Sequence, residues 1–366
     1  MSPHIDHALD IVDDMRIPVR DGIILSARVW KPKVQNAEPL PAILEILPYR
    51  KRDGTAVRDA TTHVHFAAAG YVSLRVDLRG TGESEGLFDD EYSEQELSDV
   101  EDTIAWIADQ PWCSGAVGIM GISWGGFNGL QVAARRPKAL KAVITLCSSV
   151  DRYADDIHYK GGCQLTENVG WAATVMSWFS MPPDPALVGD QWRDIWLERM
   201  ENTPFLISDW IKHSERDAYW KHGSVCEDFS RIEAAVLTIG GWHDGYRNTP
   251  AKLLEGQTSG PIKAIMGPWN HKYPHIAAPE PRIDFLTEAL RWWDRWLKGV
   301  PNGAESDADY RVYVMDGIEP RTSFDHRPGT WVGLPEWPSE HIAHQVLSLG
   351  DGTLGDGRRP RHASVT

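Results

Sequence analysis

The sequence predicts an α/β fold built around a mostly parallel β-sheet. Short runs that are apolar at nearly every position alternate with stretches in which apolar residues recur every three or four positions. Parallel strands are buried on both faces and need helical connections, so this alternation is typical of such a sheet. The runs expected to form its strands are residues 42–47, 71–76, 117–120, 142–147, 236–239 and 262–266.

Local signals place a hairpin before this sheet and two helices beside it. Two β-prone runs flank an Asp-Gly pair at residues 21–22, which predicts an antiparallel hairpin. Ser93 and Glu96 form a capping-box pattern ahead of apolar residues at helical spacing. A further helix is expected from 284 to 298, where Gly299 provides a stop signal.

The order of strand-like and helix-like patterns along the chain predicts four segments. Residues 1–148 and 235–299 alternate between strand-like and helix-like patterns and are expected to form the two parts of one core. Residues 149–234 interrupt that alternation with Trp residues at helical spacing, which predicts a helical cap over the sheet. After a polar linker, residues 300–366 contain three short β-prone runs. We interpret them as the start of a β-sandwich whose remainder the sequence lacks.

Composition narrows the classes of function. A formal charge of −15 argues against binding to a nucleic-acid backbone, which depends on clustered Lys and Arg. No early basic segment precedes an apolar run, and no stretch approaches the roughly 18 apolar residues of a membrane span, so a cytoplasmic globular protein is expected. Four widely spaced Cys residues favour free thiols over disulfides or a metal site, and Cys147 is expected in the core.

Ser123 is the candidate nucleophile. It is the central residue of a G-x-S-x-G pattern at residues 121–125. An expected strand precedes the pattern and a segment with helical spacing follows it, which is the order of a nucleophile elbow. The glycines relieve crowding at the sharp turn and leave the hydroxyl exposed. The alternative interpretation, a serine in an ordinary glycine turn, does not account for the flanking strand and helix.

Asp244 and His271 are the candidate acid and base. A serine hydroxyl needs a base to accept its proton, and the base needs a carboxylate to fix its tautomer. After a nucleophile elbow these groups follow in the order acid, then His, on loops beyond later strands. Asp244 and His271 each follow one of the last two apolar runs of the core. His243 and His275 lie nearby, but His243 adjoins Asp244 and should point elsewhere, and His275 is a further turn along.

Two groups are candidates for the oxyanion hole. The backbone N–H of the residue after the nucleophile, here Trp124, is the first. A second donor should come from the loop after the run 42–47. That loop lacks a glycine run, so the side-chain hydroxyl of Tyr49 is a candidate for the second donor.

Taken together, these motifs resemble those of the cocaine-esterase and Xaa-Pro dipeptidyl-peptidase family, which also includes α-amino acid ester hydrolases. The matching segments are residues 21–22, 48–49, 77–86, 121–126, 241–245, 267–271 and 292–299. The resemblance implies an α/β-hydrolase core, a helical cap and a C-terminal jelly roll starting near residue 300. It also implies the triad Ser123, Asp244 and His271, with Tyr49 as an oxyanion donor alongside the Trp124 amide.

The segment 77–86 matches the family without carrying a nucleophile or base. We interpret its Asp77 and Arg79 as a structural pair that holds loops near the elbow.

The predicted function is hydrolysis of a carboxylic ester, or of an amide, through an acyl-enzyme. No metal or organic cofactor is needed for this chemistry. Four aromatic residues are expected to line an apolar substrate pocket, which favours esters: Trp171, Trp178, Trp242 and Tyr246. The expected partner is a small ester, an amide or a short peptide, and the sequence leaves open whether the chain forms a homo-oligomer.

Three other functions stay open. An Xaa-Pro dipeptidyl peptidase or an α-amino acid ester hydrolase would need carboxylates to hold the α-ammonium group of its substrate. Glu167, Asp184 and Asp190 of the expected cap are of the right type, although ordinary surface solvation also explains them. The third is a catalytically inactive protein of the hydrolase fold that binds a ligand.

Overall fold

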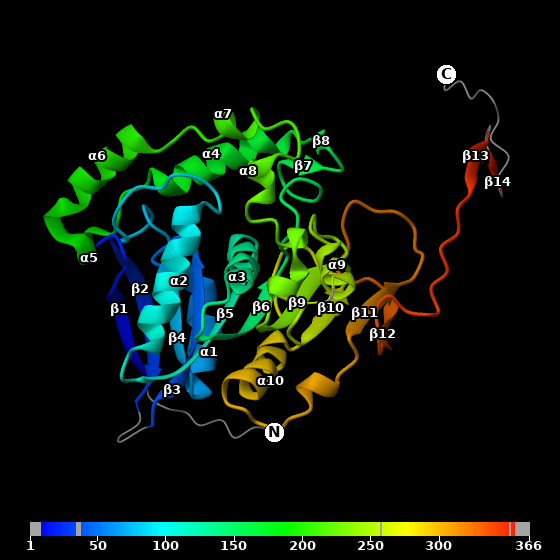
Figure 1. Ribbon diagram of the computed structural model, residues 1–366, viewed down its shortest axis with the longest axis horizontal. Helices are drawn as coiled ribbons and strands as arrows, with labels where there is room; N and C mark the ends of the chain where they lie inside the picture. The colour runs from blue at the N-terminus through cyan, green and yellow to red at the C-terminus, as the bar shows by residue number, and fades with distance from the viewer. Residues whose placement is uncertain (1–8, 34–37, 257, 351–352, 356–366) are drawn as a thin grey trace.

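The computed structural model describes residues 9–33, 38–256, 258–350 and 353–355. Within these residues a ten-stranded sheet runs through the molecule in the order β1-β2-β4-β3-β5-β6-β9-β10-β11-β12 (Figure 1). Neighbouring strands are parallel from β4 to β11, and the antiparallel pairs stand at the two edges. The strands are β1 (Leu9–Pro18), β2 (Ile24–Pro32), β3 (Leu40–Leu47), β4 (Val72–Asp77), β5 (Cys113–Ile122), β6 (Leu140–Leu146), β9 (Ala235–Gly241), β10 (Ile262–Gly267), β11 (Tyr310–Met315) and β12 (Gly329–Leu334).

The predicted strands and hairpin are confirmed. Each of the six apolar runs overlaps one strand from β3 to β10, and β5 extends furthest beyond its run, by four residues before it and two after it. The pair β1–β2 forms the hairpin around residues 21–22. Parallel strands end together at one edge of a sheet, so the loops after β3, β5, β6, β9 and β10 gather there.

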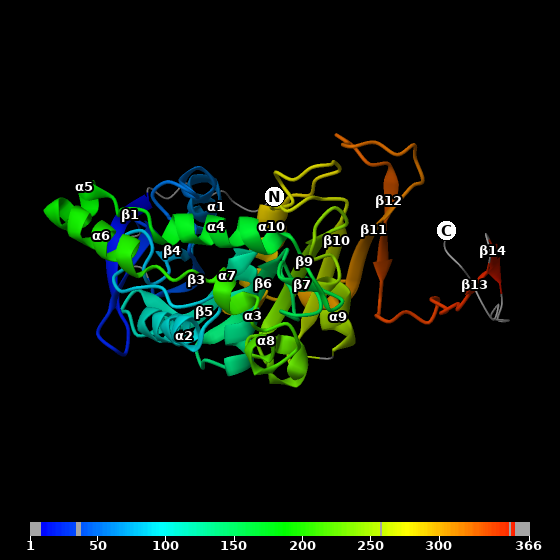
Figure 2. The same cartoon turned by 90° about the horizontal axis from the view of Figure 1, so that it is seen from above.

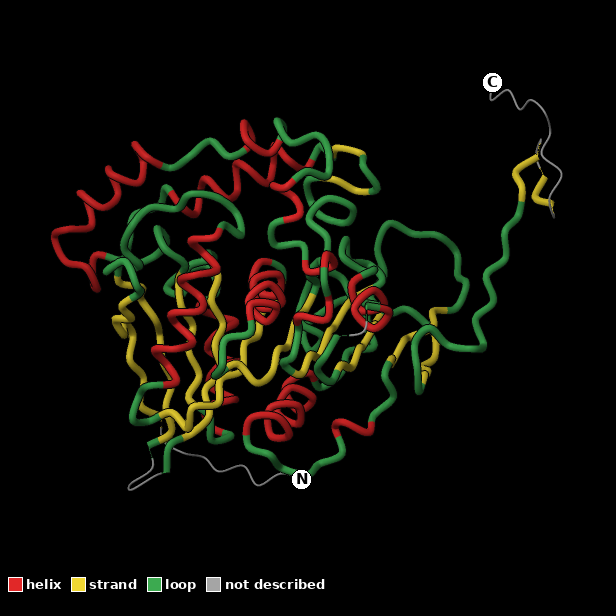
Figure 3. The backbone as a smooth tube through the Cα atoms, in the orientation of Figure 1, coloured by secondary structure: helices red, strands yellow, loops and turns green. Residues whose placement is uncertain are grey.

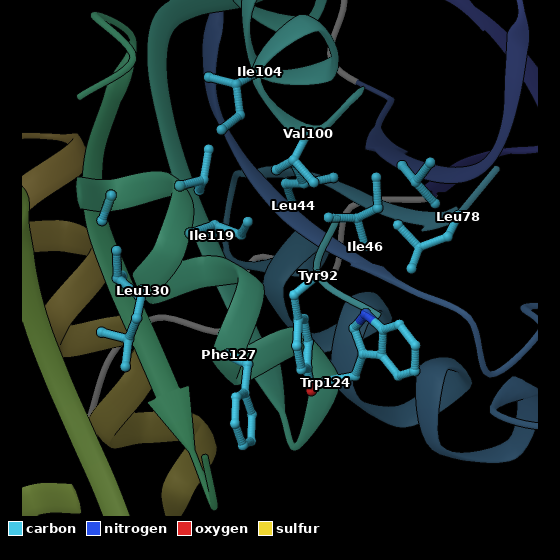
Figure 4. Close-up of a cluster of buried hydrophobic side chains, with 14 of the residues drawn as sticks. Leu44, Ile46, Leu78, Tyr92, Val100, Ile104, Ile119, Trp124, Phe127 and Leu130 are labelled. Atoms are coloured by element: carbon cyan, nitrogen blue, oxygen red, sulfur yellow. The ribbon is translucent and has the colours of Figure 1, made fainter. Parts of the chain in front are cut away.

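Helices cover both faces of the sheet, as the tube in Figure 3 shows. α2 (Glu94–Ala108) and α3 (Trp124–Arg135) lie on one face, and α1 (Ala56–Ala68) and α10 (Phe285–Leu297) lie on the other. Alternate residues of β3 face opposite layers, as a strand dictates: Leu44 and Ile46 join the cluster with α2 and α3, whereas Ile43 joins the cluster with α10. Figure 4 shows the first cluster. α9 (Thr249–Glu255) packs beside β9 and β10.

The helix ends follow the sequence signals. The Ser93 hydroxyl accepts a hydrogen bond from Glu96 N at 3.2 Å, and the Glu96 carboxyl accepts one from Tyr92 N at 2.9 Å. The capping box therefore forms, with its return bond shifted by one residue from the usual partner, the N-cap amide. Gly299, after α10, has the left-handed conformation expected of a helix stop, with φ of 70°.

Within the segment 149–234, residues 149–222 lie above the edge of the sheet where the parallel strands end (Figures 1 and 2). Residues 229–234 return to the start of β9, where Arg136 after α3 donates to the carbonyl of Arg231 at 2.9 Å. The helices of this segment are α4 (Glu167–Phe179), α5 (Pro185–Val188), α6 (Trp192–Asn202), α7 (Ile207–Trp210) and α8 (Ala218–Lys221). A short hairpin, β7 (Tyr159–Lys160) and β8 (Cys163–Gln164), and the 3₁₀ turns η1 (Gly189–Gln191), η2 (Val225–Glu227) and η3 (Phe229–Arg231) complete it. Buried Arg199 fastens α6 to the core by donating to the carbonyls of Gly82 and Ser84 at 2.9 and 2.8 Å.

The C-terminal strands differ from the expected separate sandwich. After the 3₁₀ turn η4 (Ala304–Ser306), β11 pairs with β10 in parallel and β12 pairs with β11, so both extend the central sheet. Tyr310 and Val312 bury their side chains with Met266, which covers an edge that β10 would otherwise expose. The third predicted run, residues 344–349, is a strand only at its end, where β13 (Ser348–Gly350) pairs with β14 (Thr353–Gly355).

No helix in the described part of the chain has the length and apolar character needed to cross a membrane.

A buried ion network holds the loop that follows β3. Lys51 is fully buried, and its ammonium group contacts Asp77 at 3.2 Å and also Glu83. Its backbone N–H donates to Asp77 at 2.8 Å. Arg79 instead pairs with Asp99 at 2.8 Å. The interpretation of Asp77 and Arg79 as one structural pair was therefore wrong, because the two belong to separate ion pairs.

Replacement of Lys51 by Met is expected to destabilise the protein by about 3–5 kcal/mol, because it leaves buried Glu83 without its cation and leaves Asp77 with only Arg75, at 3.5 Å. Urea unfolding followed by circular dichroism measures this change. The matched control is Lys212→Met, since Lys212 pairs with Asp209 at the exposed surface and such pairs contribute about 0–1 kcal/mol. Equal stability of the two variants would contradict the role given to Lys51.

Candidate active site

Ser123 lies at a sharp turn between β5 and α3. Its backbone has φ of 58° and ψ of −124°, a conformation that a residue with a side chain rarely adopts. The turn is held by hydrogen bonds from Ser123 N to Leu146 O at 3.0 Å and from Phe127 N to Ser123 O at 3.0 Å. A Cβ atom on Gly121 would lie 2.4 Å from the backbone carbon of Gly125, so only glycine fits there. The local geometry is that of a nucleophile elbow.

The Tyr49 hydroxyl lies at this elbow. It accepts a hydrogen bond from Trp124 N at 3.3 Å and contacts the Ser123 hydroxyl. Burial raises the pKa of Tyr49 to about 12, and the contacts with Ser123 and Trp124 only partly oppose that rise. The phenol therefore keeps its proton at neutral pH. A phenol O–H and a backbone N–H thus meet beside one serine hydroxyl, as an oxyanion hole requires.

Asp244 and His271 form a hydrogen-bonded pair. Asp244 follows β9 and is buried, and its Oδ2 lies 2.6 Å from Nδ1 of His271 in the loop after β10. Burial by itself would raise the pKa of Asp244, but the hydrogen bond and the charge of His271 outweigh it and hold the pKa below its usual value. Tyr273 ties the same loop to β3 by donating to Glu45 at 2.9 Å. The carboxylate therefore fixes Nδ1 as the donor nitrogen and leaves Nε2 as the basic one.

The described residues show no hydrogen bond between Ser123 Oγ and His271. The side chain of His271 is 44% exposed, and its ring centroid lies 5.8 Å from that of Tyr246. Tyr246 in turn contacts Phe127, the residue whose N–H bonds to Ser123, at 5.3 Å between ring centroids. Asp244 is thus hydrogen-bonded directly to His271, and His271 lies at the edge of the sheet where β5 ends and the elbow begins. Hydrogen bonds between nucleophile and base are often long without substrate.

The two other late-loop histidines are held away from this pair. His243 Nδ1 hydrogen-bonds to the carbonyl of Pro268 at 2.5 Å. The His275 ring stacks on Phe285 of α10 at 5.7 Å between centroids. Among the described residues neither ring forms a hydrogen bond with Asp244, whereas His271 does.

Aromatic side chains from the cap gather around the elbow. The ring centroid of Trp178 lies 4.6 Å from that of Tyr49. The ring centroid of Trp171 lies 5.6 Å from that of Trp178 and 6.2 Å from that of Trp124. These four rings, of Tyr49, Trp124, Trp171 and Trp178, form a connected aromatic wall next to the elbow, and Tyr246 lies beside His271. Three of the four predicted pocket residues, Trp171, Trp178 and Tyr246, therefore lie near the elbow.

Trp242, the fourth predicted pocket residue, lies elsewhere. Its indole N–H donates to the carbonyl of Tyr313 in β11 at 2.8 Å, and its ring packs with Leu254 and Met266. Two positions separate Trp242 from Asp244, but the chain turns between them, because Asp244 N bonds back to Gly241 O at 3.0 Å. The assignment of Trp242 to the pocket was wrong for this reason.

Cys147 belongs to the site as well as to the core. It directly follows β6, the strand between the serine strand and the Asp244 strand, and it is 5% exposed. Its sulfur, an Asp244 carboxylate oxygen and a His271 ring nitrogen all lie within 4.8 Å of one another. Burial and the charge of Asp244 raise the pKa of Cys147 well above its usual value, so a neutral thiol faces the carboxylate. Its position at the end of a central strand was the sequence signal for this contact.

Comparison with known proteins identifies the family. A family model described as X-Pro dipeptidyl-peptidase (S15 family) matches residues 21–273. The chain belongs to the S15 family. Among curated relatives of this S15 chain, the cocaine esterase of Rhodococcus sp. (strain MB1 Bresler) is 25% identical over 94% of the chain and 63% of its own length. The S15 chain thus spans less than two thirds of that relative.

Solved structures identify the fold of this S15 protein. A CocE/NonD family hydrolase from Staphylococcus aureus matches it with a TM-score of 0.76 at 20% identity, over 95% of this chain and 60% of that one. An aminopeptidase from a marine sediment Thaumarchaeota archaeon matches with a TM-score of 0.66 at 20% identity, over 98% and 63% of the two chains. The fold is therefore that of an α/β-hydrolase, as predicted.

Removal of the Tyr49 hydroxyl is expected to lower kcat for an ester by about 10²- to 10³-fold with little change in KM, since an oxyanion donor acts in the transition state. Steady-state kinetics of Tyr49→Phe measure this effect. Tyr71→Phe is the matched control, because that hydroxyl also makes one hydrogen bond, at 2.6 Å to Asp294, but packs against α10 on the opposite face. A kcat for Tyr49→Phe equal to that of the control would exclude Tyr49 from the oxyanion hole.

Proposed function

We propose that this chain is a serine hydrolase that cleaves carboxylic esters through an acyl-enzyme on Ser123. The observation that carries the proposal is the 2.6 Å hydrogen bond between Asp244 and His271 at the sheet edge that also carries the elbow. An oriented base, a serine in a strained turn and two oxyanion donors are the components of acyl transfer. Membership of the S15 family and similarity to an esterase agree with this chemistry.

The proposed reaction has two steps. His271 Nε2 accepts the Ser123 proton as Oγ attacks the ester carbonyl, and the oxyanion is held by Trp124 N–H and the Tyr49 hydroxyl. Collapse of the tetrahedral intermediate breaks the carbonyl–oxygen bond, and the alcohol leaves with the proton from His271. Water then attacks the acyl-enzyme with His271 as base and releases the acid. Asp244 stabilises the imidazolium in both steps.

The aromatic wall supports an ester with an apolar or aryl group. Trp178 and Trp171 belong to α4, so the cap supplies part of the surface next to the nucleophile. Rings of this size offer large apolar area and few polar groups, which suits aryl or bulky acyl groups.

A second candidate, hydrolysis of α-amino esters or of Xaa-Pro peptides, is favoured by two carboxyl groups near this wall. Glu91 accepts a hydrogen bond from the Trp171 indole at 2.6 Å. Asp156 is 2% exposed, and one of its oxygens has no hydrogen-bond partner among the described residues. Both lie close enough to Tyr246 to raise the pKa of its phenol. An α-ammonium group would complement such a charge, although His158 already pairs with Glu91 at 2.7 Å.

The three cap carboxylates considered from the sequence do not serve this purpose. Asp184 caps α5 and pairs with Arg52 at 3.1 Å. Glu167 and Asp190 are exposed.

Substrate selection tests the proposal. The chain is assayed with p-nitrophenyl acetate, p-nitrophenyl butyrate and alanyl-prolyl p-nitroanilide, each with Asp156→Asn as a parallel variant. Ester turnover well above anilide turnover, unaffected by Asp156→Asn, is the expected result. Strong anilide turnover that is lost in Asp156→Asn would show that the protein is a peptidase. Turnover of none of the three by a folded protein would favour a ligand-binding protein of the hydrolase fold.

A further inference from the structure

A buried carboxyl group lies directly behind the elbow. Glu96, in the first turn of α2, is 5% exposed. It accepts hydrogen bonds from the Trp124 indole N–H at 2.8 Å and from the Asn128 amide at 3.3 Å, both on α3. Its other oxygen accepts the bond from Tyr92 N that completes the capping box. One side chain thus joins the first turn of α2 to the first turns of the helix that begins at the nucleophile.

Trp124 is fixed at both of its N–H groups. Its backbone N–H faces the Tyr49 hydroxyl at 3.3 Å, whereas its fully buried indole reaches Glu96. Figure 4 shows the indole beside the Tyr92 ring, and the centroids of these two rings are 5.1 Å apart. A buried indole N–H needs an acceptor, and Glu96 is the acceptor here. Loss of that acceptor would release the ring whose backbone amide points at the nucleophile.

We infer that Glu96 is a positioning residue of the oxyanion hole, which holds Trp124 through its indole and so aims the Trp124 amide. The inference rests on the proposed function of Ser123 and Trp124. It extends the site to a residue of α2 that touches neither the substrate nor the reacting atoms.

The surroundings of Glu96 also decide when it is charged. Burial raises the pKa of Glu96 to about 8, against the opposing effect of its three N–H donors, and the charge of Glu91 raises it further. No Lys, Arg or His side chain of the described residues forms an ion pair with Glu96. Glu91 is paired with His158 and lies near Arg152, and burial keeps the Tyr92 phenol neutral by raising its pKa.

The sign of the resulting pH dependence follows from linkage. An unfolded Glu ionises near pH 4.3, so between about pH 4.3 and 8 the folded chain holds a proton that the unfolded chain has lost. Stability therefore falls as pH rises through this window. Above it, a negative charge behind the elbow opposes the negative charge that develops on the substrate oxygen. Ester hydrolysis should therefore decline as the pH rises above about 8, where Glu96 ionises.

Two substitutions at Glu96 separate its role as a hydrogen-bond acceptor from the effect of its charge. Glu96→Gln keeps an oxygen for the indole N–H and cannot ionise. Glu96→Leu removes the acceptor. Kinetics with p-nitrophenyl acetate from about pH 6 to 10, with spontaneous hydrolysis subtracted, give kcat and KM, and thermal unfolding is followed over the same range. Glu94→Gln is the matched control, since Glu94 lies in the same helical turn but pairs with Arg135 at the surface.

The expected results are specific to a positioning role. Glu96→Leu lowers kcat on the order of 10-fold with KM little changed, as a displaced oxyanion donor requires. Glu96→Gln keeps most of kcat at pH 7, loses the alkaline decline and flattens the pH dependence of unfolding. In Trp124→Phe, which lacks the indole N–H, Glu96→Leu has a smaller further effect.

Other outcomes overturn the inference. An alkaline decline shared by wild type and Glu96→Gln would assign the titration to another group. A wild-type kcat in Glu96→Leu would remove the positioning role, and if that variant does not fold, Glu96→Gln still tests the charge. Loss of activity in Ser123→Ala alongside unaffected Glu96 variants rejects this inference alone, whereas full activity in Ser123→Ala rejects the proposed function.

Discussion

Ser123→Ala is expected to lower kcat for p-nitrophenyl esters by about 10⁴- to 10⁶-fold, because removal of a triad serine leaves only binding and oxyanion stabilisation. The proton acceptor His271 and the donors at Trp124 and Tyr49 stay in place, so KM should change little. The serine hydroxyl is small and half-buried, and its removal at a turn of positive φ should not lower the melting temperature by more than a few degrees. Steady-state kinetics and thermal unfolding measure both effects.

The control for this substitution is Ser177→Ala. Ser177 is an exposed residue of α4, and among the described residues its hydroxyl bonds only to the carbonyl of Thr174, at 2.7 Å. Its kinetics should match those of the wild type. Ester hydrolysis by Ser123→Ala at the wild-type rate, in protein with an unchanged melting temperature, would place the chemistry at another residue.

Asp244→Asn is expected to lower kcat by about 10⁴-fold near neutral pH. An amide in place of the carboxylate can donate to His271 Nδ1, which favours the tautomer with the proton on Nε2 and so blocks proton acceptance from Ser123. The imidazolium that forms in the reaction also loses its negative partner. A pH profile of kcat/KM distinguishes this substitution from simple unfolding, since the folded variant should regain part of its rate at high pH through hydroxide.

Asp284→Asn is the matched control for that change. Asp284 caps α10 by accepting from Thr287 N at 3.2 Å, and Asn caps helices as well as Asp does. Its activity should equal that of the wild type. An Asp244→Asn enzyme with wild-type kcat would show that the hydrogen bond between Asp244 and His271 is structural.

Local features of the fold and the site are predictable from the sequence, because they depend on residue type and order. The elbow glycines, the positions of Asp244 and His271 after successive strands, and the capping box are local patterns, and each determines a local conformation. The apolar runs predicted the strands for the same reason. A short apolar run, however, has the same pattern in a separate sandwich and at the edge of a larger sheet. The sequence therefore predicts β11 and β12 in a sandwich, whereas they extend the central sheet next to β10.

Contacts between distant elements were not predictable in this way. The sequence predicts Glu96 as a member of a capping box with Ser93, but its bond to Trp124 joins residues 28 positions apart and depends on how α2 packs on α3. The sequence predicts Cys147 in the core, and the order of β6 and β9 in the sheet brings its thiol to Asp244. Proximity in sequence to Asp244 predicts Trp242 in the pocket, whereas the turn between the two residues directs the Trp242 ring toward β11.

The most direct test of the central claim is labelling of the folded protein with a fluorophosphonate, followed by mass spectrometry of its peptides. Such a probe reacts with an activated serine and not with an ordinary hydroxyl. The account predicts a single adduct on the peptide that contains Ser123, with labelling strongly slowed in His271→Ala. An adduct on a different serine, or no adduct on the folded wild-type chain, would contradict it.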